Sequence, residues 1–175
     1  MPSRLRVPFG YLLGILVLVL ARPSAASLAG GGAIVLAGEA IRLWASGHID
    51  KTRALATGGP YAHTRNPLYL GSLVIAVGVA VAAASPWAAL AVAAYFAAFY
   101  PSAMREEARF LRDRFPDEYA AWAAAVPLFL PRLAPAGPRA TSFEWGRVQR
   151  NREWRTALAL PAMAALLWAR GRWLP

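Results

Sequence analysis

The chain has 175 residues, of which 58% are hydrophobic and 16% charged, with 19 lysines and arginines against 9 aspartates and glutamates. A soluble domain carries about 25% charged residues, so this composition argues against a soluble globular protein and favours a membrane protein. The chain has no cysteine and two histidines, which excludes disulfides and thiolate metal sites, and we expect no metal site. The basic excess does not predict nucleic-acid binding, because the arginines lie between apolar runs and not on one polar face.

Two apolar stretches predict a first helical pair within residues 1–46. Residues 7–21 carry no charge, and residues 23–44 are interrupted by a single glutamate and a single arginine. A membrane-spanning helix needs about 20 largely apolar residues, so the first stretch is a little short and the second is long enough. Basic residues before an apolar core also characterise signal peptides. We favour a retained helical pair, because it completes an even number of crossings.

Residues 68–104 predict a helical hairpin. These 37 residues contain no charge, and as one helix they would extend roughly 55 Å at 1.5 Å per residue. That length exceeds the apolar thickness of a bilayer, about 30 Å. Ser85 and Pro86 lie near the middle, and proline breaks a helix unless it occupies the first turn. We therefore expect two crossings joined by a tight turn at this pair.

The rest of the chain divides into two polar regions and one apolar segment. Residues 47–67 form a turn-rich loop, and residues 105–155 form a polar region that begins as a continuation of the preceding helix. Within the last segment, 156–170, residues 157–169 are apolar but number only 13. That length fits either a fifth crossing extended by its flanks or an interfacial or core helix.

The arginines predict the orientation of these segments. With the N-terminus in the cytoplasm, both polar regions lie on the cytoplasmic side, and only Arg22, Arg170 and Arg172 lie on the other. This asymmetry agrees with the positive-inside rule. We therefore expect an all-α integral membrane protein with about five transmembrane helices and a cytoplasmic C-terminal region.

Two motifs resemble those of a known superfamily. Residues 59–71 read GPYAHTRNPLYLG, which is similar to the signature GPYxxxRHPxYxG of the isoprenylcysteine carboxyl methyltransferase and phospholipid methyltransferase superfamily. Asn66 replaces the usual histidine. The second match comprises the pair Glu106-Glu107, the pair Glu118-Tyr119, Trp122, and a Val-Pro…Leu-Pro element at residues 126–131. The two matches occur in the expected order, and together they cover residues 58–131.

The resemblance implies a small integral-membrane enzyme that uses S-adenosylmethionine, with the cytoplasmic region binding the cofactor. Carboxylates suit its ribose hydroxyls or ammonium, aromatic faces suit its sulfonium or adenine, and an arginine suits a carboxylate. The matched positions that it assigns to cofactor binding are Arg65, Asn66, Tyr69, Leu70, Gly71, Glu106 and Glu107. At the surface of a membrane, the same glutamates also fit helix charges paired with neighbouring arginines.

Among these residues, Arg65 and Asn66 are the predicted catalytic pair. The mechanism implied by the resemblance is direct attack of an acceptor on the activated methyl group. Asparagine cannot act as a general base near neutral pH, whereas a carboxylate acceptor needs no deprotonation. We therefore expect a lipidic or amphiphilic acceptor, with a carboxylate slightly favoured over an amine, and contact with membrane lipids.

Three further residues are predicted to bind the acceptor: Glu39, Arg42 and Arg152. Glu39 and Arg42 are three residues apart in the second apolar stretch, where ionisable groups usually face a cavity or a partner. Their spacing also allows them to neutralise each other near the membrane surface. Arg152 lies in a polar block, residues 143–155, that fits either a cap over the active site or an interfacial helix.

Two alternative functions use the same features. Membrane reductases of the sterol type share an Arg/Asn-Pro-x-Tyr run and would bind NADPH, whose phosphate the arginines at 147–155 could hold. A non-catalytic lipid-binding protein would keep the fold without methyl transfer. Binding of S-adenosylhomocysteine, of NADPH, or of neither distinguishes the three.

Overall fold

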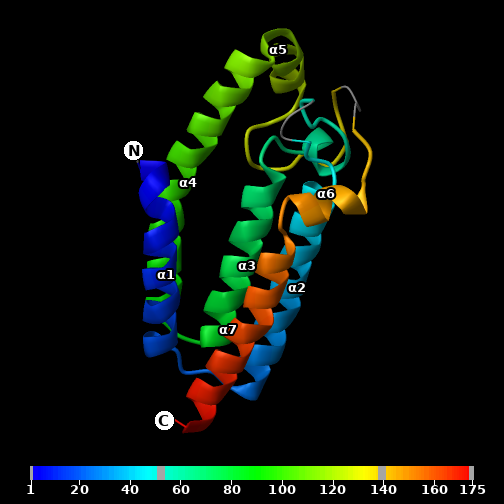
Figure 1. Ribbon diagram of the computed structural model, residues 1–175. Helices are drawn as coiled ribbons and strands as arrows, with labels where there is room; N and C mark the ends of the chain where they lie inside the picture. The colour runs from blue at the N-terminus through cyan, green and yellow to red at the C-terminus, as the bar shows by residue number, and fades with distance from the viewer. Residues whose placement is uncertain (1, 51–53, 138–140, 174–175) are drawn as a thin grey trace. The chain divides into compact units, whose positions relative to one another are not determined.

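The computed structural model describes residues 2–50, 54–137 and 141–173, and all regular structure in these ranges is helical (Figure 1). The predicted all-α class is therefore confirmed. The helices, in chain order, are α1 (Pro2–Leu20), α2 (Ala25–Ser46), η1 (Gly59–Ala62), α3 (Pro67–Ala83), α4 (Pro86–Arg114), α5 (Pro116–Ala125), α6 (Trp145–Arg150) and α7 (Trp154–Trp173). Parts of both predicted polar regions, residues 51–53 and 138–140, lie outside the described ranges.

The chain forms two compact units. The first comprises Met1–Gly38, Leu73–Ala103 and Ala157–Pro175, and the second comprises Glu39–Ser72 and Met104–Thr156. Helices α2, α3 and α4 each contribute residues to both units. Every residue predicted for the site belongs to the second unit.

The break between α3 and α4 occurs where the sequence predicts it. Helix α3 ends at Ala83, and Ala84 has a positive φ of 48°. Pro86 then occupies the first position of α4, where its missing N–H costs no intrahelical hydrogen bond. Helix α4 continues through the charged residues after Met104 to Arg114, as predicted.

In the first unit, segments of five helices enclose an apolar core. Its buried members come from α1, the residue that follows α1, α3, α4 and α7: Val17, Ala21, Ala82, Ala83, Ala88, Val92 and Leu167. Helix α2 approaches α3 so closely that a Cβ on Gly31 would lie 2.5 Å from the Gly78 carbonyl oxygen. Small residues at such crossings let helix backbones approach within a membrane.

The first unit also exposes large apolar side chains. Tyr11 is 74% exposed, Leu36 70% and Trp87 68%. Helices α2 and α4 are long and apolar enough to cross a membrane, while apolar helices at Leu5–Leu20 and Pro67–Ala83 are shorter. Helix α7 has 20 residues but does not meet the same criterion. Large apolar side chains exposed in this way are typical of a surface that contacts a membrane or another protein.

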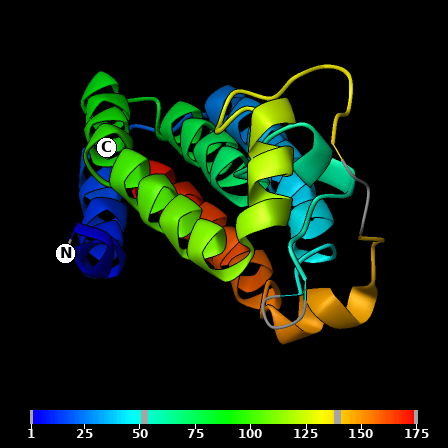
Figure 2. The ribbon, with the colours of Figure 1, turned by 90° about the horizontal axis from the view of Figure 1, so that it is seen from above.

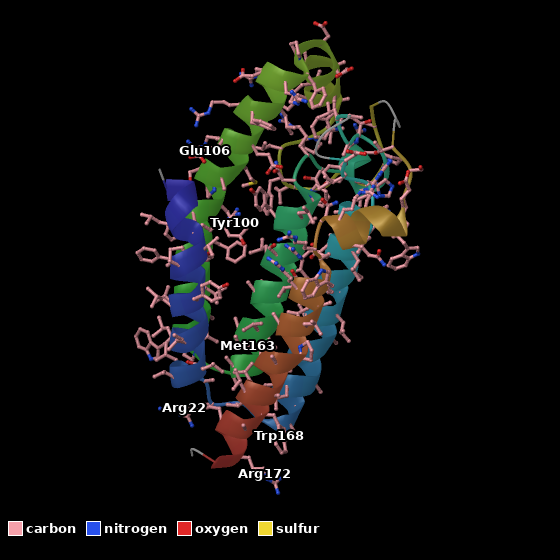
Figure 3. The ribbon with its side chains drawn as sticks, viewed as in Figure 1. Arg22, Tyr100, Glu106, Met163, Trp168 and Arg172 are labelled. Carbon is pink, nitrogen blue, oxygen red and sulfur yellow. The ribbon has the colours of Figure 1, made fainter. Side chains whose placement is uncertain are left out.

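Charged residues lie towards the two ends of the first unit. Figure 3 shows Arg22 and Arg172 towards one end, and Tyr100 towards the other. The Arg6 guanidinium lies 5.8 Å from the centroid of the Tyr100 ring, and the Tyr95 hydroxyl donates to the Arg6 carbonyl. The predicted count of five crossings and the cytoplasmic orientation remain predictions.

The second unit combines η1, α5, α6 and their loops around a buried aromatic cluster. Its largest members are Tyr61, Tyr119 and Trp122, and the Trp122 indole donates a 2.9 Å hydrogen bond to the Tyr61 carbonyl. Figure 2 shows α5 beside the loop that carries η1. These contacts hold the loop that carries η1 and the start of the signature motif, which we call the signature loop, in place beside α5.

Candidate functional site

Backbone hydrogen bonds join the two motifs found in the sequence. The Arg65 N–H donates to the Pro127 carbonyl at 2.9 Å, and the Arg132 N–H donates to the His63 carbonyl at 3.0 Å. The Ala136 N–H donates to the Ala62 carbonyl at 2.9 Å. The signature loop and the segment after α5 therefore form one scaffold, although more than 60 residues separate them.

Asn66 is a structural residue of this scaffold. It is buried, and its Nδ2 donates a 2.8 Å hydrogen bond to the Leu128 carbonyl. Its own carbonyl accepts the Leu70 N–H at the start of α3. Buried Thr64 donates to the Phe129 carbonyl at 2.8 Å and accepts the Asn66 N–H at 3.3 Å. The amide thus occupies the position of the usual histidine as a hydrogen-bond donor.

Arg42 is the centre of a partly buried polar cluster. Its Nη2 lies 2.6 Å from Glu153 Oε1, and its Nε donates to the same oxygen at 2.7 Å. Its Nη1 donates to Ser72 Oγ at 2.6 Å, and its Nη2 donates to Thr156 Oγ1 at 3.3 Å. Charge-assisted hydrogen bonds of this kind are stronger than neutral ones.

Glu39 is not satisfied by this cluster. Its nearest charged contact is Arg42 Nε at 4.0 Å, and both of its carboxylate oxygens are buried without a hydrogen-bond partner. Glu39 and Arg42 form the ion pair that their spacing allows, at 4.0 Å, but Arg42 makes its shorter contacts with Glu153. Two carboxylates therefore lie near one guanidinium, and only the Glu153 carboxylate is hydrogen-bonded to it.

Tyr61 lies within electrostatic range of the same cluster. Burial raises its pKa well above the usual value, and the charges of Glu107 and Glu153 raise it further, while Arg42 opposes them. Glu107 itself is exposed on α4. The phenol is therefore neutral in the folded protein and presents an aromatic face and a hydroxyl near carboxylates.

Arg65 belongs to a different group of side chains. Its Nη1 donates a 2.9 Å hydrogen bond to the Tyr119 hydroxyl, and its Nε is buried without a partner. Together with Tyr119 it lines a cleft of about 490 Å³, whose other lining residues are Arg105, Ala108, Arg109, Arg112 and Leu128. Within the described part of the chain, no carboxylate lines this cleft, which we call the arginine cleft.

The remaining predicted cofactor residues lie on the first turns of α3 and in the C-terminal half of α4. Tyr69 and Leu70 are partly buried, and Gly71 is buried. Glu106 is partly buried, and Figure 3 places it on α4 beyond Tyr100. Glu107 forms no ion pair with Arg109 or Arg112 among the described residues, so the helix-surface pairing considered for it is absent there.

Arg152 is not brought to the cluster. It is exposed, with a positive φ of 58°, in the turn between α6 and α7. The next residue, Glu153, is 5% exposed and holds Arg42 instead. Sequence reasoning missed Glu153 as a site residue, because it is one of two glutamates in a mainly basic block and nothing local distinguishes it.

The chain matches the phospholipid methyltransferase family over residues 9–118. It is 34% identical over 140 residues to the nickel-cobalt-cadmium resistance protein NccN of Alcaligenes xylosoxydans xylosoxydans, covering 77% of this chain and 65% of the relative. It is 39% identical over 95 residues to the cobalt-zinc-cadmium resistance protein CzcN of Cupriavidus metallidurans, and this match covers 53% of this chain and 44% of the relative.

The match therefore spans less than two thirds of the length of either relative. No solved structure matches the chain. The family match includes the signature at 59–71 and the Glu106-Glu107 pair. The chain belongs to the phospholipid methyltransferase family, a family of membrane methyltransferases.

Proposed function

We propose that this protein is an enzyme that transfers the methyl group of S-adenosylmethionine to a lipidic or amphiphilic acceptor at a membrane. Family membership supports methyl transfer. The observation that carries the cofactor assignment is the buried Glu39 carboxylate, which lacks a hydrogen-bond partner beside the pair of Arg42 and Glu153. Leaving a buried charge unsatisfied is costly, and a cationic ligand would relieve it.

The residues around Glu39 fit the chemistry of this cofactor. Bound S-adenosylmethionine supplies an activated methyl group on a sulfonium, together with an ammonium. Glu39 and Glu107 offer carboxylates to these cationic groups, and the faces of Tyr61 and Tyr69 offer the quadrupole that attracts a sulfonium. Arg42 keeps Glu153 paired, so that Glu39 stays available.

Four of the residues that the sequence predicts for cofactor binding support the same assignment. Leu70 and Gly71 lie in the first turns of α3, where Gly71 carries no side chain to obstruct a ligand. Glu106 provides a further carboxylate on α4, and Asn66 holds the loop before α3 through the Leu128 carbonyl. The protein contributes orientation and the exclusion of water.

The signature motif offers no general base, and this absence bears on which acceptor the enzyme can methylate. Asn66 offers no base, and its amide is already committed to the Leu128 carbonyl. A carboxylate acceptor needs no deprotonation, and we therefore favour it slightly over an amine. We also propose that about five helices cross the membrane with the second unit on the cytoplasmic side, where membrane lipids supply the acceptor. The predicted acceptor role of Arg42 is less favoured, because its guanidinium is fully engaged.

Calorimetric binding to the detergent-purified protein tests this proposal. S-adenosylmethionine should bind more tightly than S-adenosylhomocysteine, which lacks the sulfonium charge. Glu39→Gln should weaken binding of S-adenosylmethionine by about tenfold, which corresponds to about 1.4 kcal/mol, and should reduce the preference between the two ligands. Glu118→Gln is the matched control, because Glu118 is an exposed carboxylate on α5.

Three results would contradict the assignment. The first is binding of neither cofactor form, which would indicate a non-catalytic lipid-binding protein. The second is binding of NADPH in their place, which would indicate a reductase. The third is equal binding by wild type and Glu39→Gln, which would separate the buried carboxylate from the cofactor.

A further inference from the structure

A strip of aromatic and apolar side chains lies on the surface of the second unit, apart from the residues assigned to the cofactor. Leu133 is 100% exposed and Trp145 68% exposed, although both are large apolar side chains. The strip draws on four segments: the end of α2, the signature loop, the loop after α5 and the start of α6. We call it the aromatic strip, and its members at the surface are Trp44, His63, Leu130, Leu133, Phe143 and Trp145.

Ring contacts make most of the strip continuous. The centroid of the Trp44 ring lies 6.3 Å from that of His63 and 6.4 Å from that of His48, which is buried beneath the strip. The Phe143 centroid lies 5.9 Å from that of His48 and 5.1 Å from that of Trp145. These spacings are those of edge-to-face and tilted aromatic pairs. The strip is therefore one packed surface and not a scatter of single exposed residues.

Hydrogen bonds and close packing fix the strip in its exposed position. The His63 Nδ1 lies 2.8 Å from the carbonyl oxygen of Arg132, which ties the signature loop to the loop after α5. The Glu144 N–H donates to the Gly47 carbonyl at 3.0 Å. The Phe143 ring lies so close to Gly47 that a Cβ at that position would overlap it. Ordered apolar surface of this kind marks an interaction site.

Helix α2 connects the strip to the membrane. This helix is long and apolar enough to cross a bilayer, and Trp44 lies in its last turn, next to α6 (Figure 1). The rise along α2 from Ala25 to Trp44 is roughly 28 Å at 1.5 Å per residue, close to the apolar thickness of a bilayer, about 30 Å. Tryptophan is enriched at the boundary between headgroups and hydrocarbon. When α2 crosses the bilayer, Trp44 therefore reaches that boundary.

The charges next to the strip complement a headgroup layer. Three exposed arginines follow the strip along the chain: Arg150, Arg152 and Arg155. None of them forms an ion pair within the described ranges. The two glutamates of the same stretch are engaged elsewhere, Glu144 with Arg147 and Glu153 with Arg42. Arginine beside exposed tryptophan is typical of segments that lie in the membrane interface.

We propose that the aromatic strip lies in the boundary layer between headgroups and hydrocarbon of the membrane that α2 crosses. The strip then holds the signature loop and the start of α6 at one depth. This contact is a surface that anchors the second unit, and it requires neither the cofactor nor the acceptor of the proposed function.

Single fluorescent labels in nanodiscs test this placement, because the chain has no cysteine of its own. Leu133→Cys and Trp145→Cys place a nitrobenzoxadiazole label at two distant positions of the strip, and both replace exposed side chains. Glu118→Cys is the matched control, since Glu118 is exposed on α5 outside the strip. Each full-length variant is reconstituted at one copy per disc, so that no second copy covers the strip. Circular dichroism checks that each variant keeps the helix content of wild type.

Lipids that carry a nitroxide near the headgroup should quench both strip labels several-fold more strongly than the control label. Iodide in the water should quench the control label more strongly than either strip label. Iodide quenching at both strip positions would overturn the proposal and would indicate that another protein covers the strip. Lipid quenching at only one strip position, or equally strong lipid quenching of the control, would also overturn it, because the strip would then not mark a common depth. Neither measurement involves methyl transfer or cofactor binding, so failure here is separate from failure of the proposed function.

Discussion

Glu39 and Glu153 flank the same guanidinium, yet the structure predicts opposite consequences when each is replaced by glutamine. Glu153 accepts a 2.7 Å hydrogen bond from Arg42 Nε and lies 2.6 Å from Arg42 Nη2, whereas Glu39 accepts no hydrogen bond and lies 4.0 Å from Arg42. Both substitutions keep the shape of the side chain and remove one negative charge. The comparison therefore isolates the contribution of direct hydrogen bonding.

Glu153→Gln should destabilise the protein by about 2 kcal/mol, since hydrogen bonds to charged groups contribute about 1.5–3 kcal/mol. For a chain of this length that loss lowers Tm by roughly 4–8 °C. Glu39→Gln removes a buried charge that has no hydrogen-bond partner. It should leave Tm unchanged within about 2 °C or raise it, because an unsatisfied buried carboxylate destabilises the fold.

Thermal unfolding of the three detergent-purified proteins, followed by circular dichroism, measures both effects without added ligand. Equal losses in the two variants would refute the reasoning, because they would show that Glu39 contributes as much as Glu153. A loss confined to Glu39→Gln would reverse the assigned partners of Arg42.

Three further predictions concern helix packing, the signature motif and a buried tyrosine. Gly31→Ala should destabilise the protein by about 1–3 kcal/mol, because the added methyl group would overpack against the Gly78 carbonyl. Gly30→Ala has nothing within 4 Å of the added Cβ and should stabilise the protein by roughly 0.5–1 kcal/mol in the same unfolding assay. Asn66→Asp should cost about 1–3 kcal/mol, because it replaces the donor to the Leu128 carbonyl with a second acceptor, and an unchanged Tm would contradict that hydrogen bond. Tyr61 has a raised pKa in the folded state, so its contribution to stability is complete below the unfolded pKa of about 10 and is lost as pH rises above it. Stability measured between pH 9 and 11 (about one unit on either side of that value) should therefore fall less steeply in Tyr61→Phe than in wild type, and parallel curves would contradict the assignment.

The sequence alone determines the apolar helices α1 to α4 and the turn that separates α3 from α4. Largely apolar runs predict α1 to α4, and Ser85-Pro86 predicts the turn between α3 and α4, because proline fixes φ and lacks an N–H at any position along the chain. The continuation of α4 beyond Met104 also follows from its own apolar spacing. These features depend on residues close together in sequence, which is why a single sequence is sufficient to predict them.

The composition of the site is decided by tertiary structure. Helical spacing correctly places Glu39 and Arg42 on one face, but the partner of Arg42 is Glu153, 111 residues away. Arg152 and Glu153 are adjacent in sequence, and only the turn at Arg152 exposes the first and buries the second. In the same way, Arg65 meets the arginines of α4 because Tyr119 lies between them. Contacts between segments that are distant in sequence decide which charged side chains are buried together. A charge pair forms only where folding brings its members within a few ångströms of each other.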